Sequence, residues 1–256
     1  MESERYKKGW EKLKEVDGSV GEAVVDSLNE IAPDLGKYII EYGFGDVYSR
    51  EGTSLKQKEV AVVAALTALG NAAPQLKVHI NGAINVGCSI EELVEIMIQM
   101  SVYCGFPAAI NGITVLKEVI YERNIEFNPI SQNPVENRFK VGAEWLEKLE
   151  EGHIEELKEK LDSIAPDMVN YIIGHAYGSV YNRKNLEASF RQIATISALT
   201  VKGTAAPQLA FHIKAGLSSG LTKNEIIETM ILMSVYAGFP AAINGINVAK
   251  TVFEDM

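Results

Sequence analysis

The chain has 256 residues, of which 47% are hydrophobic and 23% charged, and its formal net charge is −10. This balance is typical of a globular protein with a packed core and excludes disordered and fibrous classes. The acidic excess argues against nucleic acid or an anionic membrane surface as a partner, because both are bound through clustered Lys and Arg. The length allows one large domain or two small ones.

Targeting signals and cysteine chemistry give little that is specific. The first residues, MESERYKKGWEKLKEV, are charged throughout, and no segment reaches the roughly 18 uncharged apolar residues that a membrane span requires. We therefore expect a cytoplasmic protein. Cys88 and Cys104 form neither a CxxC nor a zinc-type spacing, so structural thiols in a reducing compartment are the simplest interpretation and no metal site is predicted.

Nearly the whole chain is a tandem repeat of one sequence unit. The phrase IAPD begins at residues 31 and 164, AAPQL at 72 and 205, and SVY at 101 and 234, an offset of 133 in each case. Solenoid repeats are shorter and more numerous, so two copies of this length indicate a duplicated domain. We predict a first domain over residues 1–123, a linker over 124–137 with two prolines, and a second domain over 138–256.

Helix signals follow one another along each unit. Pro33 and Pro166 suit the first turn of a helix, where a missing N–H costs nothing. Ser54 and Gln57 have the spacing of a capping box before the run VAVVAALTAL, which Gly70 can end in the left-handed conformation. The segment AAPQLKVHINGAINV predicts the next helix.

The second half of each unit is also helical. Ser89 with Glu92, and Thr222 with Glu225, predict capping boxes. The Gly-Phe-Pro of residues 105–107 predicts a break, after which Pro can start another helix. Since alternation with period two is not sustained anywhere, we predict an all-α protein with about six helices per repeat.

One histidine recurs in both copies. His79 and His212 each lie four residues after a glutamine, Gln75 or Gln208, so each pair shares a helix face. Imidazole titrates close to neutral pH and suits proton transfer without a metal. A lone histidine on an apolar helix is also common as a satisfied core residue, and both interpretations stay open.

An acid stands near the start of the most apolar helix. Glu59 follows its cap, and its counterpart in the second copy is Gln192. A stabilising charge near a helix N-terminus is the plain interpretation. If Glu59 instead points toward His79, burial would raise its pKa and the two groups could divide acid and base roles.

Matched cations and tyrosines complete the candidate site. An arginine is usually exposed on the protein surface and has no specific role. A cation that recurs at the same position of both repeats, near the histidine, could nevertheless orient an anionic ligand. The tyrosines end an apolar helix and need a hydrogen-bond partner if buried, although a helix–helix corner explains most of their motif. The substrate-binding candidates are Arg50, Arg183, Lys58, Arg191, Tyr103 and Tyr236, together with Gln75 and Gln208.

Taken together, these motifs resemble the carboxymuconolactone decarboxylase family. The resemblance rests on the segments GDVYSREG, PQLKVHINGAINVG, SIEELVEIMIQ and YCGFPAAINGI in the first copy, and GSVYNRKN, PQLAFHIKAG and YAGFPAAINGI in the second. The resemblance implies a tandem alkyl hydroperoxidase D-like fold that forms hexameric rings, here from three two-domain chains. It also implies removal of carbon dioxide from 4-carboxymuconolactone without a cofactor.

Residue by residue, the resemblance assigns the family histidine to His79 and His212 and the arginine to Arg50. A second histidine expected four residues before the tyrosine is replaced by Gln99 and Leu232. In the peroxidase branch the family glutamate matches Glu59, but the CxxC positions are held in the two copies by Ala72 with Gln75 and by Ala205 with Gln208, so neither copy has a dithiol.

Three hypotheses follow. The first is a cofactor-independent lyase in which Arg50 and Lys58 hold a carboxylate, and His79, assisted by Glu59, protonates the enolate that loss of carbon dioxide leaves. The second is a peroxidase, of the kind called peroxiredoxin-type, that uses Cys104. The third is a scaffold or small-molecule-binding protein without catalysis.

Overall fold

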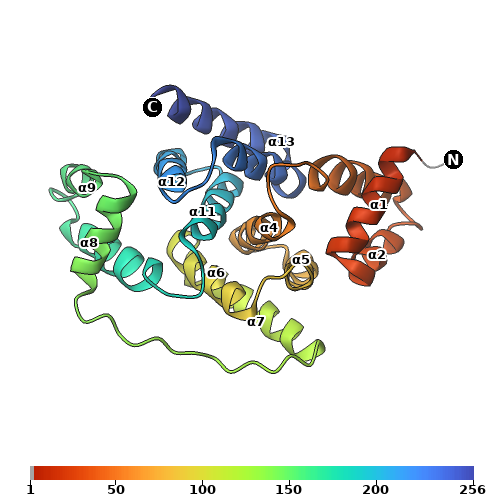
Figure 1. The fold of residues 1–256 in the computed structure, drawn as a ribbon, viewed down its shortest axis with the longest axis horizontal. Coiled ribbons are helices and arrows are strands. Elements are labelled where there is room, and N and C mark those ends of the chain that lie inside the picture. Colours follow the sequence, from red (N-terminus) through yellow and green to blue (C-terminus); the bar gives the residue numbers. More distant parts are fainter. Residues whose placement is uncertain (1–2) are drawn as a thin grey trace.

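The computed structural model describes residues 3–256, and all regular elements in this range are helices (Figure 1). The predicted all-α duplication is therefore confirmed. The first repeat contains α1 (Glu4–Val16), α2 (Gly18–Ser27), α3 (Pro33–Tyr38), η1 (Ile39–Tyr48), α4 (Leu55–Leu69), α5 (Ala73–Asn85), α6 (Ile90–Tyr103) and α7 (Phe106–Glu122). The second contains α8 (Arg138–Leu149), α9 (His153–Leu161), α10 (Pro166–Tyr171), η2 (Ile172–Tyr181), α11 (Ala188–Lys202), α12 (Ala206–Ser218) and α13 (Lys223–Glu254).

The predicted helix boundaries are confirmed where capping chemistry sets them. Both hydrogen bonds of the capping box form at Ser54, Ser89 and Thr222, and Gly70 ends α4 with a φ of 72°. Pro33 and Pro166 lie in the first turn of their helices. These signals act over three or four residues, so the surrounding fold does not override them.

The sequence did not predict the two π-helices, η1 and η2, which occupy equivalent positions in the repeats. The first helix of each repeat crosses its π-helix at glycines. A Cβ on Gly9 would collide with the carbonyl oxygen of Ile40, and a Cβ on Gly142 with that of Ile173. Because these obstacles are backbone atoms, the crossing requires glycine. Wide π turns are frequent at functional sites, and η1 supplies part of the site described below.

Gly9→Ala is expected to lower the free energy of unfolding by about 1–3 kcal/mol, as overpacking does, and Gly142→Ala by a similar amount. Urea unfolding followed by circular dichroism measures the loss. Gly174→Ala is the control, because its Cβ would meet only the Arg138 side chain, 3.5 Å away. Equal losses at Gly9 and Gly174 would contradict this account of the crossing.

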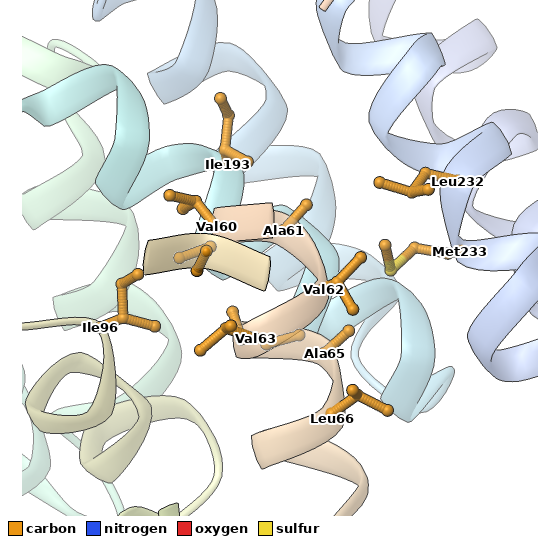
Figure 2. Packing of buried hydrophobic residues seen from close by; sticks show 14 of the residues in the cluster. Val60, Ala61, Val62, Val63, Ala65, Leu66, Ile96, Ile193, Leu232 and Met233 are labelled. Carbon is orange, nitrogen blue, oxygen red and sulfur yellow. The ribbon is translucent and has the colours of Figure 1, made fainter. Parts of the chain in front are cut away.

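One hydrophobic core runs through both repeats. Helices α4 and α11 pack against each other at the centre of the molecule, surrounded by α6 and α13 (Figure 1). Val60 and Val63 of α4 share this core with Ile96, Ile193 and Met233 (Figure 2). The two repeats therefore stabilise each other rather than folding around separate centres.

A smaller cluster belongs to the second repeat alone and joins α8, α9, α10 and η2 to α12. Between α7 and α8 the chain is irregular over residues 123–137 and runs along one side of the molecule (Figure 1). The predicted linker over 124–137 lies in this segment. The exact domain limits remain a prediction, because residues from before and after the linker share the central core.

Among residues 3–256, α13 is the single helix whose length and composition would suit a membrane span. It is broken at Gly238, which has a φ of 81°, and it buries Met230, Leu232 and Met233 against the protein. We therefore assign α13 to the core of the fold. The same break gives the second copy of the Gly-Phe-Pro corner that the sequence predicted.

Candidate active site

A cavity of about 410 Å³ lies in the first repeat between α1, α2, η1 and α5, and α13 of the second repeat closes it. Its volume is in the range of small-molecule sites. Most of the lining is apolar, including Leu13, Val25 and Phe44. The buried polar groups in the lining are Asp17, Tyr48, His79 and Ser234.

His79 is the central group of this site. Its Nδ1 atom lies 3.1 Å from Oε2 of Glu59 and 3.9 Å from Oδ1 of Asp17. Burial by itself lowers the pKa of His79, but the carboxylates of Glu59 and Asp17 outweigh burial and raise it to about 8. The ring is therefore protonated at neutral pH. With Nδ1 turned to the acids, Nε2 on the other side of the ring is the nitrogen left for a ligand.

Asp17 is a site residue that the sequence analysis missed. It caps the end of α1, its side chain is 4% exposed, and Oδ1 has no hydrogen-bond partner. Burial, opposed by His79, raises the pKa of Asp17 to about 7. It lies before the recognisable motifs, and its counterpart is Glu150 rather than an identical residue. The one signal in the sequence is that Asp17 and Glu150, at equivalent positions of the two repeats, are both acids.

A chain of hydrogen bonds connects the two repeats through Glu59. The Tyr48 hydroxyl donates to Oε1 of Glu59 at 2.6 Å and lies 2.7 Å from the hydroxyl of Tyr236. Since Tyr48 has only one hydroxyl hydrogen, Tyr236 is the donor between the two phenols. Burial is the main cause that raises the pKa of both tyrosines well above the ordinary value, so both stay protonated.

The tyrosine at each histidine comes from the opposite repeat. The ring of Tyr236 contacts the ring of His79 edge-on, with centroids 5.0 Å apart and planes at 85°. Tyr103 contacts His212 in the same way, at 5.0 Å and 86°. The sequence predicted both tyrosines as candidates but not this exchange, which makes each site depend on both repeats.

The close approach of the two acids depends on Gly82. A Cβ at this residue would lie 2.9 Å from Oδ1 of Asp17 and 3.1 Å from Oε2 of Glu59. Such contacts are too tight for a well-packed interior. Its counterpart in the second repeat is Ala215, so the space between the acids is a feature of the first repeat only.

Asp17, Glu59 and His79 form the one group among residues 3–256 whose ligand atoms all lie within 4.8 Å, as a bound metal would require. The protein already occupies these atoms of Glu59, because Oε2 accepts from His79 and Oε1 accepts from Tyr48. A separation of 3.1 Å is ordinary for an N–H···O hydrogen bond. We therefore interpret the cluster as a proton-sharing group.

The equivalent site in the second repeat is electrically different. Nδ1 of His212 lies 2.9 Å from Oε1 of Gln192, an amide that cannot carry a charge. Burial lowers the pKa of His212 to about 3. Glu150, the counterpart of Asp17, accepts instead from Lys214 at 2.8 Å. His212 is therefore a neutral residue packed among aromatic side chains, including Phe211 and Tyr103.

The predicted arginines lie in ion pairs between the repeats rather than in the cavity. Arg50 binds Glu228 through two hydrogen bonds of 2.7 Å. Arg183 binds Glu95, at the equivalent place, over 2.9–3.1 Å. These contacts occupy the guanidinium groups, and neither arginine lines the cavity. The structure therefore gives the expected carboxylate-binding role of these residues no support.

Lys58 and Arg191, the second pair of cations at equivalent positions of the repeats, also make contacts within the protein. Lys58 donates to the backbone carbonyls of Tyr48, Arg50 and Thr53. Arg191 donates to Glu95, to Gln99 and to the carbonyl of Arg183. Lys58 belongs to α4 and Arg191 to α11; both are buried, and neither lines the cavity.

The remaining candidates divide between the two repeats. Gln75 lines the cavity at an exposed position one turn before His79, whereas Gln208 is exposed in the second repeat and not among the lining residues. Cys104 is partly buried beside Met100, and burial raises the pKa of its thiol to about 11. A thiol in this state is a poor nucleophile at neutral pH.

The fold and the site define a class of protein: two fused all-α repeats with a buried imidazole–carboxylate cluster beside a small cavity. The model of the carboxymuconolactone decarboxylase family matches residues 33–118 and 166–251, about two thirds of the chain. The chain belongs to this family.

Similar proteins agree with this membership. The 4-carboxymuconolactone decarboxylase of Acinetobacter baylyi is 34% identical over 122 residues, which cover 47% of this chain and 90% of that protein. Nitrosuccinic acid decarboxylase of Metarhizium robertsii is 32% identical over 83 residues, which cover 32% of this chain and 57% of that protein. A solved structure described as a gamma-carboxymuconolactone decarboxylase subunit, from Burkholderia xenovorans, covers 98% of both chains with a TM-score of 0.63 and 20% identity, and shares the fold.

Proposed function

We propose that the first repeat is a lyase site that removes carbon dioxide from a small carboxylic acid by acid–base chemistry, without a cofactor. The observation that carries the proposal is the position of His79 at the wall of an apolar cavity, with Nδ1 3.1 Å from Glu59 and 3.9 Å from Asp17, two acids that favour the protonated ring. Membership of a decarboxylase family and two relatives named as decarboxylases support it. The fold alone would not, because one fold hosts many activities.

The reaction needs one proton and an electron acceptor within the substrate. The bond between the carboxylate and its neighbouring carbon breaks, and carbon dioxide leaves. The bonding electrons remain as an enolate, delocalised onto a carbonyl group of the substrate itself. His79 then transfers the proton on Nε2 to the carbon that lost the carboxylate. The neutral imidazole recovers a proton from water, so one proton is consumed for each carbon dioxide released.

The other residues of the site keep His79 in the donating state. Glu59 accepts the Nδ1 hydrogen and stabilises the positive ring, and Tyr48 fixes the orientation of the Glu59 carboxylate. The apolar lining also favours the reaction. The substrate carboxylate has a localised charge that loses hydration in the cavity, whereas in the transition state this charge is spread over the forming enolate and the departing carbon dioxide and depends less on water.

Carbon dioxide release from two probes tests the proposal: 2-oxocyclohexanecarboxylate and 4-carboxymuconolactone, each corrected for spontaneous decay. Catalysed release from at least one is expected, and His79→Ala should lower kcat by about 100-fold or more, as loss of a general acid does. His212→Ala is the matched comparison and should retain most of the activity, because the neutral imidazole of His212 is a far weaker acid than a protonated ring. No catalysed release from either probe, or equal losses in the two variants, would refute the proposal.

The association of three chains into a ring also stays a proposal. Phe106 and Ile110 are exposed at the start of α7, and their counterparts Phe239 and Ile243 are exposed in the second repeat. Exposed apolar residues in a repeated pattern are typical of surfaces that bind protein, which supports the proposal. The cytoplasmic location stays a prediction from the sequence.

A further inference from the structure

Asp17 lines the cavity with a carboxylate oxygen that no hydrogen-bond donor of the described residues reaches. This atom, Oδ1, is buried and has no partner. The nearest cation, His79, lies 3.9 Å away through Nδ1, and the hydrogen on Nδ1 points to Glu59 instead. Buried polar atoms of proteins nearly always have a hydrogen-bond partner, so an unpartnered one in a cavity wall is a candidate for contact with a ligand.

Asp17 shares this interior with a second acid, Glu59. One carboxylate oxygen of each residue lies within 4.8 Å of the other, and Gly82 leaves the space between them. Glu59 accepts a hydrogen at both of its oxygens, from Tyr48 and from His79, which favours its ionised form. Asp17 has no such donor. It is therefore the acid of the pair that can hold a proton.

The charge of the cluster depends on this proton. The titratable groups that face Asp17 from other elements are Glu59 of α4, His79 of α5, Tyr48 of η1 and Tyr236 of α13. Both tyrosines stay protonated and neutral, and the neighbours of Asp17 on α1 and α2, Leu13 and Gly21, carry no charge. The cluster thus has one positive and two negative charges when Asp17 is ionised, and it is neutral when Asp17 is protonated.

An acidic ligand brings a further negative charge into the cavity. The lining contains neither lysine nor arginine among the described residues, so no other cation compensates this charge. A ligand carboxylate beside Asp17 therefore favours the protonated form of Asp17, as a like charge nearby does for any buried acid. The proton removes the repulsion and turns Asp17 into a hydrogen-bond donor. The ligand charge then replaces that of Asp17 in stabilising the protonated ring of His79.

The cavity offers a ligand few other donors. Four hydroxyl groups of the lining give their hydrogens to acceptors within the protein, namely those of Tyr42, Tyr48, Ser234 and Tyr236. Tyr38 and Gln75 lie at the exposed rim. The donors that remain beside the buried cluster are Nε2 of His79 and, once it is protonated, Asp17.

From this arrangement we infer that Asp17 acts as a carboxylic acid in the substrate complex and donates a hydrogen bond to the oxygen on which the enolate charge develops. The inference rests on the proposed function and adds a catalytic residue to it. Stabilisation of an enolate by a buried aspartic acid that stays protonated is an established pattern of acid–base catalysis. The proton on Asp17 comes from water when the substrate binds and stays on Asp17 during the reaction. One proton, that of His79, is still consumed for each carbon dioxide released.

Infrared difference spectroscopy tests whether a ligand brings a proton to Asp17. The probe is cyclohexanecarboxylate, which does not react. It is added at pH 8, above the pKa of about 7 of Asp17 in the free protein, so that the starting carboxylate is mostly ionised. We expect saturable binding and a new C=O band of a protonated carboxylic acid. A carbon-13 label in the carboxylate of the probe should leave this band in place, because the proton lies on the protein.

Two variants assign the band. Asp17→Asn should abolish it, because the amide has no carboxylic acid group. Glu150→Gln is the matched control, because Glu150 is the counterpart of Asp17 in the second repeat and pairs with Lys214 outside the cavity. This variant should keep the band.

Turnover gives a second measurement. At pH 6, below the pKa of about 8 of His79, Asp17→Ala should lower kcat by about 10²-fold, as loss of a donor to a developing oxyanion does. Asp17→Asn should lose about tenfold or less, because its amide N–H can replace the carboxylic acid as donor. Both variants remove the charge of Asp17 from His79, so the difference between them reports the hydrogen bond.

Four results would overturn the inference: no saturable binding of the probe, no new band, a band that persists in Asp17→Asn, or equal kcat values for Asp17→Ala and Asp17→Asn. None of them would decide the lyase proposal, which depends on carbon dioxide release and its loss in His79→Ala. Conversely, a band from Asp17 without any catalysed decarboxylation would support its protonation by an acidic ligand and refute the proposed reaction.

Discussion

Glu59→Gln is expected to lower kcat/KM at pH 7 by about 10²–10⁴-fold, because protonation of His79 depends on this carboxylate. The substitution reproduces the arrangement of the second repeat, where Gln192 faces His212 and burial holds the pKa of His212 at about 3. Asp17 still lies 3.9 Å from His79. Asp17 therefore keeps part of the electrostatic stabilisation of the protonated ring. For this reason we expect the pKa of His79 to fall by less than the full difference between His79 and His212, and we give the loss of activity as a range.

The direction of the pH dependence follows from the proposed role of His79. The donor is active when protonated, so in the unmodified protein kcat/KM should be fully developed below pH 8 and fall as the pH rises through about 8. In Glu59→Gln the fall should come at lower pH. Nuclear magnetic resonance titration of the histidine ring signals measures the pKa directly, independent of any substrate.

The reciprocal variant is the control for this prediction. Gln192→Glu should raise the pKa of His212, because it restores an acid 2.9 Å from the ring. Activity need not appear, since Phe211 and Tyr177 of the second repeat replace the smaller or less polar Val78 and Phe44. An unchanged pKa of His79 in Glu59→Gln would show that Glu59 does not control the proton.

Glu95→Ala is expected to lower the free energy of unfolding by about 3–5 kcal/mol, the usual loss when one partner of a buried ion pair is removed. Glu95 and Arg191 are each only 2% exposed, and Arg183 donates to the same carboxylate. Without Glu95, the Arg191 guanidinium would stay buried with its charge uncompensated. Urea unfolding followed by circular dichroism measures the loss.

The duplication provides the matched control. Glu228 is the counterpart of Glu95, but its partner Arg50 is 44% exposed and can turn to water. Glu228→Ala should therefore cost only about 1 kcal/mol, close to the value of a surface pair. If the two variants lost the same stability, burial of Arg191 would not be the cause.

Contacts between the repeats also explain why the two copies could diverge. Each repeat supplies the tyrosine at the other's histidine and the glutamate that binds the other's arginine. Replacement of Glu59 by Gln192, of Gly82 by Ala215 and of Asp17 by Glu150 removes the charged cluster from one copy. The packing that the first copy needs is left in place.

Much of this protein is determined by the sequence alone. The offset of 133 residues, the capping boxes and the helix-starting prolines predicted the duplication and most helix boundaries, because each signal acts within a few residues. The pairing of Glu59 with His79 was also foreseeable, since the two lie 20 residues apart on consecutive helices.

The tertiary structure alone decided the rest. Tyr236 meets Tyr48 across 188 residues of chain, and Arg50 meets Glu228 across 178. No local pattern records such contacts, so the arginines that looked available for a substrate are instead neutralised by acids of the other repeat. Asp17 and the π-helices were hidden for the same reason: their positions depend on how closely two helices cross at glycine, which is a property of packing between elements.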